Sequence, residues 1–275
     1  MKTEKNYLEK LINAPYFLWS AIFIVVPLIM VAYYAFTDKS GAFTLDNMAQ
    51  IGRYTQTFGI SLLYATEATV ICLIISYPIS YFISQMGRIG KRMILMLVML
   101  PMWMNFLIRT YSWITILSNT GIINTLLKRV GIGPLQLINT RGAVILGMVY
   151  NYLPYMILPI YTVMEKLDHS ILEAAADLGA SPAARLRRII FPTSLPGVIS
   201  GITMVFVPSV STFYISQKLG GGKTMLIGDV IEMQFQTSYN YNLGAALSLV
   251  LMVLILISLA IMNRFADSGD GGIVI

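Results

Sequence analysis

The feature that most limits how this chain can fold is a series of apolar runs, each about twenty residues long. That is the length a helix needs to cross about 30 Å of hydrocarbon. Only 12% of the 275 residues are charged, and the mean hydropathy is +0.71. We predict an all-α membrane protein with six transmembrane helices, at residues 15–36, 60–86, 93–117, 143–164, 195–217 and 244–262.

Basic residues orient these spans, because Lys and Arg collect in the cytoplasmic loops of membrane proteins. The short loop 87–92 is half basic, which favours both termini inside. We therefore expect a multi-pass plasma-membrane protein with a cytoplasmic segment 1–14, a transmembrane domain 15–263 and a flexible cytoplasmic tail 264–275. The net charge of +6 follows from the same loops, so membrane lipid is an expected partner and nucleic acid is not.

The loop 165–194, between the fourth and fifth spans, has more helical order than a connector needs. Asp168 or Ser170 can cap a helix, and three alanines after Glu173 favour its continuation. Gly179 is placed to end this helix in a left-handed conformation.

A second short helix is predicted to follow, with Ser181 as its N-cap and Pro182 at its first position. Pro192 and Pro196 are expected to break it. The residues alone leave two readings open. The loop is either a docking surface for a soluble partner or an interfacial loop whose arginines bind anionic lipid.

The same loop resembles the signature of permease subunits of binding-protein-dependent ABC importers, which reads Glu-Ala-Ala, three residues, Gly, nine residues and Ile-x-Leu-Pro. Phe191 stands here in place of the leucine. The resemblance implies the type I ABC importer permease fold, with this loop as a cytoplasmic coupling helix seated in an ATPase. The residues assigned to that contact are Asp168, Glu173, Ala174, Ala175, Asp177, Gly179, Ile189 and Pro192.

The resemblance also implies the partners. Two copies of a cytoplasmic ATPase would bind ATP and Mg, a second homologous permease subunit would complete the pore, and an extracytoplasmic substrate-binding protein would deliver the cargo. No cofactor or metal is expected in this chain, and no enzymatic activity. The stretch 220–224 ends like a phosphate-binding loop, but Gln217 occupies a position where that pattern needs glycine.

Further blocks resemble the PotB-type subfamily of spermidine/putrescine permeases. They lie at residues 107–111, 165–168, 213–216, 219–221 and 226–231. This resemblance implies a polyamine cargo. Two alternatives stay open: an ABC importer permease for another small solute, and a secondary transporter driven by an ion gradient.

Polar residues within the spans suggest a path for the cargo. An ionisable group costs about 2.5–3.5 kcal/mol there, so Glu67 and Arg109 each need a partner or a wet cavity. They could pair with each other or act in transport. An ammonium is stabilised by carboxylates and aromatic faces. The predicted path comprises Glu67, Trp103, Asn105, Arg109, Tyr150, Tyr152, Tyr155, Tyr214 and Asp229.

Two simpler readings compete with this path. Tyrosines in a span also serve as an interfacial belt or in helix packing. Asp229 lies in the predicted outer segment 219–243, where it could simply be part of a solvated helix face.

Overall fold

The computed structural model describes residues 15–270, including their side chains except at positions 169, 263 and 265–270. The predicted segment 1–14 and the end of the predicted tail, 271–275, lie outside the described residues. Within the described range the chain is helical, and its β pairing is limited to one isolated bridge between Thr37 and Phe43. The prediction of an all-α fold is confirmed.

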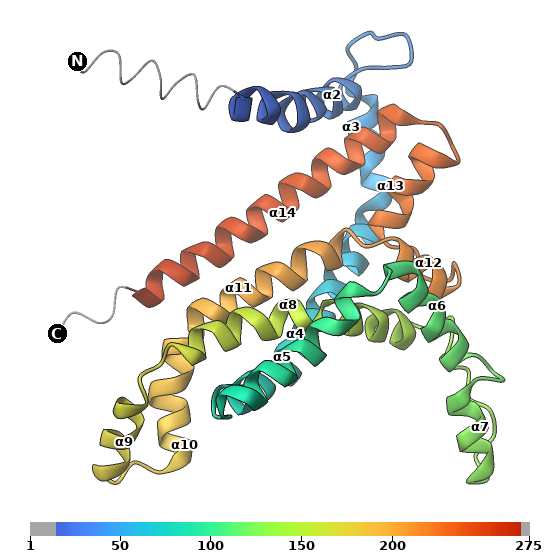
Figure 1. The fold of residues 1–275 in the computed structure, drawn as a ribbon. Helices are drawn as coiled ribbons and strands as arrows, with labels where there is room; N and C mark the ends of the chain where they lie inside the picture. Colours follow the sequence, from blue (N-terminus) through green and yellow to red (C-terminus); the bar gives the residue numbers. More distant parts are fainter. Residues whose placement is uncertain (1–14, 271–275) are drawn as a thin grey trace, which may run out of the picture. The chain divides into compact units, whose positions relative to one another are not determined.

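The helices carry the labels of Figure 1. They are η1 (Ala21–Val25), α2 (Val26–Ala35), α3 (Asp46–Gln50), η2 (Ile51–Tyr54), α4 (Thr55–Ser84), α5 (Arg88–Trp103), α6 (Phe106–Leu117), α7 (Ile122–Arg129), α8 (Arg141–Glu165), α9 (His169–Asp177), α10 (Pro182–Arg185), η3 (Leu186–Ile190), α11 (Phe191–Val210), α12 (Tyr214–Gly220), α13 (Ile227–Gln236) and α14 (Tyr241–Asp270).

The chain divides into two compact parts, which are treated separately below. The first part consists of residues up to 55 together with 230–254, and the second part consists of 56–229 together with the residues from 255 onward. Two buried asparagines hold the first part together after α2 ends. The side-chain amides of Asn242 and Asn47 donate to the carbonyl of Thr37, at 2.7 and 2.9 Å. Apart from these hydrogen bonds at its end, α2 leaves most of its side chains exposed.

Five helical runs among the described residues are long and apolar enough to span a membrane, and there are six if a bent pair of helices is counted as one span. The span predicted at 93–117 falls in this pair and is broken rather than continuous, because α5 meets the segment Phe106–Arg129 at an angle of 93°. Met104 and Asn105 are extended between them, and the Asn105 side chain accepts a hydrogen bond from Leu107 N at 2.8 Å as the N-cap of α6. Pro101, which donates no backbone hydrogen bond, lies in the last turn of α5.

Three other predicted boundaries differ from the structure. The span 195–217 ends at Val210, where the chain turns before α12 begins. Pro192 and Pro196 do not break the helix, which runs from Pro182 to Val210 without interruption. At the other end of the chain, α14 extends to Asp270, beyond the start of the tail predicted from residue 264.

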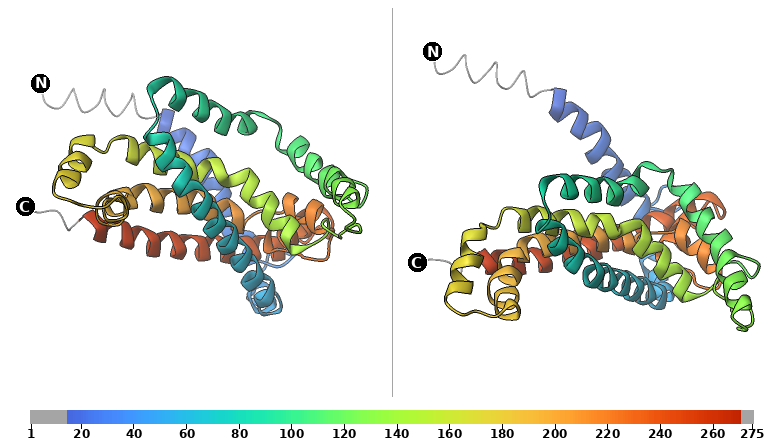
Figure 2. Two further views of the ribbon diagram at one scale, coloured as in Figure 1. Left: turned by 90° about the horizontal axis from the view of Figure 1, so that it is seen from below. Right: turned by 60° about the horizontal axis from the view of Figure 1, so that its bottom comes forward.

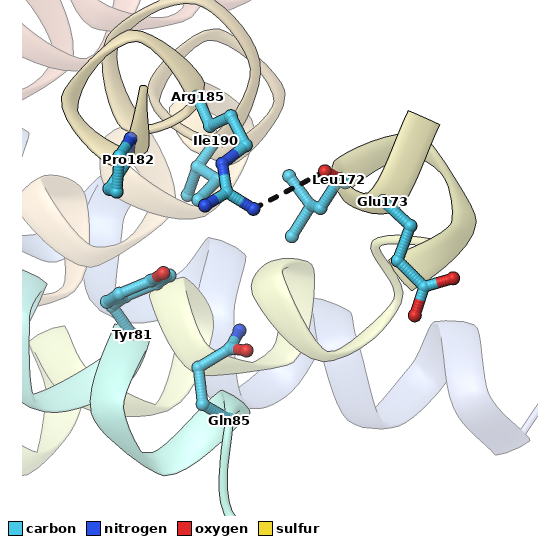
Figure 3. A pocket seen from close by; sticks show the side chains of 7 residues that line it. All are labelled: Tyr81, Gln85, Leu172, Glu173, Pro182, Arg185 and Ile190. Atoms are coloured by element: carbon cyan, nitrogen blue, oxygen red, sulfur yellow. Dashed lines mark hydrogen bonds between the residues drawn. The ribbon is translucent and has the colours of Figure 1, made fainter. Parts of the chain in front are cut away.

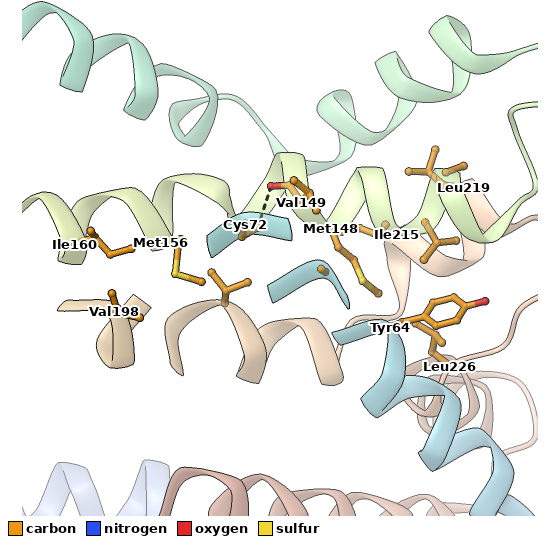
Figure 4. Packing of buried hydrophobic residues seen from close by; sticks show 14 of the residues in the cluster. Tyr64, Cys72, Met148, Val149, Met156, Ile160, Val198, Ile215, Leu219 and Leu226 are labelled. Carbon is orange, nitrogen blue, oxygen red and sulfur yellow. Dashed lines mark hydrogen bonds between the residues drawn. The ribbon is translucent and has the colours of Figure 1, made fainter. Parts of the chain in front are cut away.

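The core of the second part is the contact between α8 and α11. Gly197 and Gly201, one helical turn apart on α11, face α8: a Cβ on Gly197 would lie 2.8 Å from the carbonyl of Pro159, and one on Gly201 would lie 2.7 Å from Met156 Sδ. Residues without side chains thus let two helix backbones approach closely. The buried cluster around this contact includes Cys72, Met148, Ile160, Val198 and Ile215 (Figure 4).

This packing places the two ends of α8 in different surroundings. The α9–α10 hairpin follows the carboxyl end of α8 and leads back into α11, whereas α6 and α12 lie toward the amino end (Figure 1, Figure 2). The two groups of residues predicted from the sequence, the coupling loop and most of the cargo path, therefore lie toward opposite ends of one pair of packed helices.

The replacement Gly197→Ala is expected to destabilise the protein by about 1–3 kcal/mol, because the new methyl group meets the backbone of α8. The measurement is the thermal unfolding midpoint of the purified protein. Gly59→Ala is the control, since a Cβ on Gly59 in α4 meets nothing within 4 Å. It should raise the midpoint or leave it unchanged. Equal losses from both replacements would contradict this account of the contact.

Candidate functional site

The loop 165–194 forms the helical hairpin that its sequence predicts. The Asp168 side chain accepts a hydrogen bond from Ser170 N at 2.9 Å and caps α9. The Ser181 hydroxyl accepts one from Ala184 N at 3.3 Å and caps α10, with Pro182 in its first turn. Of the two N-caps considered for the first helix, the structure selects Asp168.

Gly179 ends α9 as predicted. Its φ of +80° lies in the left-handed region, which is unfavourable for residues with a side chain. Gly179 N donates to Ala176 O at 2.8 Å, and Ala180 N donates to Ala175 O at 2.9 Å, which is the Schellman pattern. The last carbonyls of α9 are therefore satisfied, and the direction of the chain between the two helices is defined.

One side of α9 is anchored and the other is open. Leu172 is buried in the core of the second part, whereas Ile171, Glu173 and Ala174 are exposed. Leu178, at the turn, is 89% exposed. The hairpin thus presents apolar groups next to the carboxylates of Glu173 and Asp177.

Arg185 braces the hairpin from within. Its Nη1 donates to the carbonyl of Leu172 at 3.5 Å, a long bond that ties α10 to α9. The guanidinium lines a pocket of about 180 Å³ with Tyr81 and Gln85 at the end of α4 (Figure 3). Glu173 also borders this pocket, but its carboxylate points away from Arg185 (Figure 3).

The hairpin joins α11 through a π-helical segment, η3, in which Phe191 N donates to Leu186 O. This wider turn explains why Pro192 does not break the helix. Proline lacks an N–H and its ring clashes with the carbonyl four residues earlier in a regular helix. A π turn changes that alignment at the point where Pro192 enters α11.

Among the predicted path residues, Glu67 pairs with a different arginine from the one expected. The Arg141 guanidinium donates from Nη2 to Glu67 Oε1 and from Nε to Oε2, the second bond at 3.2 Å. Arg141 also lies over the ring of Tyr64, 5.1 Å from its centroid. A pair between Glu67 and Arg109 does not form.

Arg109 is instead a buried charge. It is 9% exposed, and its Nε and Nη1 atoms have no hydrogen-bond partner. The guanidinium lies over the face of Phe106, 5.8 Å from the ring centroid. A cation in this setting repels other cations, which makes Arg109 itself an unsuitable contact for a cationic cargo.

The tyrosines of α8 pack against neighbouring helices. Tyr150 meets Trp113 edge-on with 5.3 Å between ring centroids. The hydroxyl of Tyr152 donates to the carbonyl of Pro208 at 3.3 Å. Tyr155, 6.5 Å from Tyr152 between centroids, is the most exposed of the three at 39%. These contacts agree with the packing interpretation for Tyr150 and Tyr152.

A second internal cation lies among aromatic rings. Lys218 Nζ lies 5.7 Å from the ring centroid of Tyr214 and 5.9 Å from that of Tyr111. Trp103 is 73% exposed, and Asn105 is exposed beside it at the bend between α5 and α6. The predicted path residues therefore do not converge on one enclosed site.

Asp229 does not belong to a solvated face, contrary to the simpler reading. It is 4% exposed, and its carboxylate accepts hydrogen bonds from Ser216 Oγ at 2.8 Å and Leu226 N at 2.7 Å. Both donors are neutral groups of this chain. These bonds fix the turn before α13, so Asp229 has a structural role that its burial explains.

Sequence reasoning missed Tyr64, Arg141, Lys218 and Leu178. Arg141 lies in a segment assigned to the outer loops, where its charge was used only to orient the spans. Tyr64 precedes Glu67 by three residues on α4, so the two share a helix face, and that spacing was the available signal.

Comparison with known proteins identifies a family that this chain matches. A family described as binding-protein-dependent transport system inner membrane component matches residues 76–268, a range that contains the hairpin and the α8–α11 contact. The chain is 39% identical over 250 residues to the spermidine/putrescine transport system permease protein PotB of Haemophilus influenzae, covering 87% of each chain. It is 38% identical over 227 residues to PotB of Escherichia coli K12, covering 79% of this chain and 82% of that one.

A solved structure shares the fold. A bacterial ABC transporter involved in the import of the acidic polysaccharide alginate contains a chain that superposes with a TM-score of 0.76, covering 97% of both chains at 17% identity. A sequence identity of 17% supports a shared fold and no conclusion about function.

Arg109→Met is expected to leave the thermal unfolding midpoint of the purified protein unchanged or to raise it. The replacement removes a buried charge whose Nε and Nη1 atoms lack partners, and methionine keeps much of the side-chain volume. A loss of about 3–5 kcal/mol, the usual cost of breaking a buried pair, would contradict this account and show that Arg109 is paired in the folded protein.

Proposed function

Because this chain belongs to the binding-protein-dependent transport system inner membrane component family, we propose that it is the permease subunit of an ATP-driven polyamine importer, with spermidine or putrescine as its cargo. The chain forms part of the pore, a multi-pass component of the inner membrane. The observation that carries the proposal is the capped hairpin α9–α10, which displays the importer signature with its Glu173 and Leu178 exposed.

The cargo assignment rests on sequence similarity. Identities of 38–39% over most of the chain to permeases named for spermidine and putrescine support it. The alginate importer shares the fold at 17% identity and does not bear on the cargo. No ion-coupled mechanism is needed on this proposal, since ATP supplies the energy.

The hairpin is the contact with a separate cytoplasmic ATPase, which binds ATP and Mg. Leu178 and the alanines bury apolar surface in a groove of that partner, and Glu173 and Asp177 supply charged contacts at its rim. The anchored Leu172 and the Arg185 brace pass the ATPase movement into α8 and α11. Two ATPase copies, one for each permease subunit of the pore, fit this arrangement.

The remaining partners follow from the same proposal. A second, homologous permease subunit supplies the other half of the pore, and the exposed apolar side chains of α2 offer it surface. A substrate-binding protein delivers the cargo outside. A solved relative of the same fold is in complex with a periplasmic protein carrying an alginate pentasaccharide, which supports this mode of delivery. Both termini and the hairpin then face the cytoplasm.

The test of this function is reconstitution. The chain is purified with the proteins that accompany it, placed in liposomes, and assayed for spermidine uptake with ATP inside and the binding protein outside. Uptake that requires ATP supports the proposal. Transport by the isolated chain without ATP would overturn it. Glu173→Arg should abolish ATP-dependent uptake and co-purification of the ATPase while the chain still enters the membrane.

Gly179→Val tests the hairpin geometry. Valine at a φ of +80° is strained by about 1–2 kcal/mol or more, so the turn should rearrange and the ATPase should no longer co-purify. Gly179→Asn is the matched control, because asparagine tolerates the left-handed region, and it should retain most of the ATPase. If both variants keep the ATPase equally well, the shape of this turn does not matter for docking.

A further inference from the structure

The carboxylate of Glu67 and the ring of Tyr64 together form a cation-binding pair on α4. The carboxylate accepts both hydrogen bonds of one guanidinium fork, and the ring lies 5.1 Å below the same group. A charged acceptor beside an aromatic face is the chemistry that stabilises an organic cation. The cation that occupies this pair is Arg141, from the first turn of α8.

The ion pair that holds Arg141 is open to water. The side-chain exposures are 50% for Arg141 and 30% for Glu67, so solvent and salt screen the pair. Arg141 is also the first residue of α8, where the positive end of the helix dipole disfavours a cation. Tyr64, by contrast, is 6% exposed and packed in the core, so its ring stays in place when Arg141 leaves.

We propose that Glu67 and Tyr64 form a binding site for a primary ammonium group, and that Arg141 is a tethered occupant which an incoming ammonium displaces. This inference rests on the proposed function, because a polyamine carries the ammonium groups concerned. With the proposed topology, α8 begins on the outer side, so the site lies toward the side from which the cargo arrives. Displacement frees the amino end of α8 from α4.

Replacing Arg141 and replacing Glu67 are expected to change the affinity for spermidine in opposite directions. With a tethered competitor, the apparent affinity equals the intrinsic affinity multiplied by the fraction of time that the site is free. Arg141→Gln should therefore tighten spermidine binding about twofold to sixfold, the range that a pair of about 0.2–1 kcal/mol allows. Glu67→Gln should weaken it by about tenfold or more, since the charged acceptor is lost. A pair with a purely structural role predicts weaker binding in both variants.

The measurement is equilibrium binding of radiolabelled spermidine to the purified complex of permease and ATPase subunits, without binding protein. Nanodiscs of phosphatidylcholine are used so that anionic lipid does not bind the polyamine. Arg141→Lys keeps a cation beside Glu67 and should bind spermidine like the unmodified protein. Lys91→Gln is the matched control: it breaks the ion pair with Glu165, 2.8 Å apart at the other end of α8, and should not tighten binding.

The outcomes test the ammonium site and the identity of the cargo separately. Opposite shifts for Arg141→Gln and Glu67→Gln support displacement. Shifts in the same direction, or none, overturn displacement, and the polyamine cargo survives if the unmodified importer takes up spermidine in liposomes. If the unmodified importer does not take it up and Arg141→Gln fails to bind it, both the cargo and the ammonium site are wrong.

Discussion

The close approach of α8 and α11 is the constraint on which the rest of the second part depends. It exists because Gly197 and Gly201 leave room for the backbone of α8 around Met156 and Pro159. Lipid tails are as apolar as leucine, so a membrane helix pair gains little from hydrophobic burial and must gain from tight contact instead. The same contact holds both ends of the α9–α10 hairpin, which leaves α8 and returns through α11. A movement imposed on the hairpin therefore acts on two helices that move together.

The features predicted well from the sequence are those set by neighbouring residues. The helical runs, the N-caps at Asp168 and Ser181 and the left-handed turn at Gly179 each follow from local chemistry. The breaks were harder to place. Asn105 caps a new helix within an apolar run that hydropathy treats as continuous. Pro192 looks like a break, but the π turn before it removes the conflict, and the sequence carries no simple signal of that turn.

The pairing of charges could not be predicted in the same way. Glu67 has two candidate arginines, and its partner is the one 74 residues away in sequence, which is a matter of three-dimensional distance. Arg109, a charged residue within α6, has buried nitrogens that remain without partners. Asp229 turns inward to hold a turn. In each case the residue type indicated a need for a compensating partner, and only the fold shows whether a partner is present.

The π segment at Leu186–Ile190 has a consequence for how the helix from Pro182 to Val210 faces its surroundings. A π turn holds about one residue more than an α turn, and one residue corresponds to a rotation of about 100° around a helix axis. The stripe of residues on α10 that faces α9 is thus out of phase with the stripe on α11 that faces α8. A single helical wheel drawn through the whole helix would misassign one of them. The face that contacts α9 and the face that contacts α8 are set independently along one continuous helix.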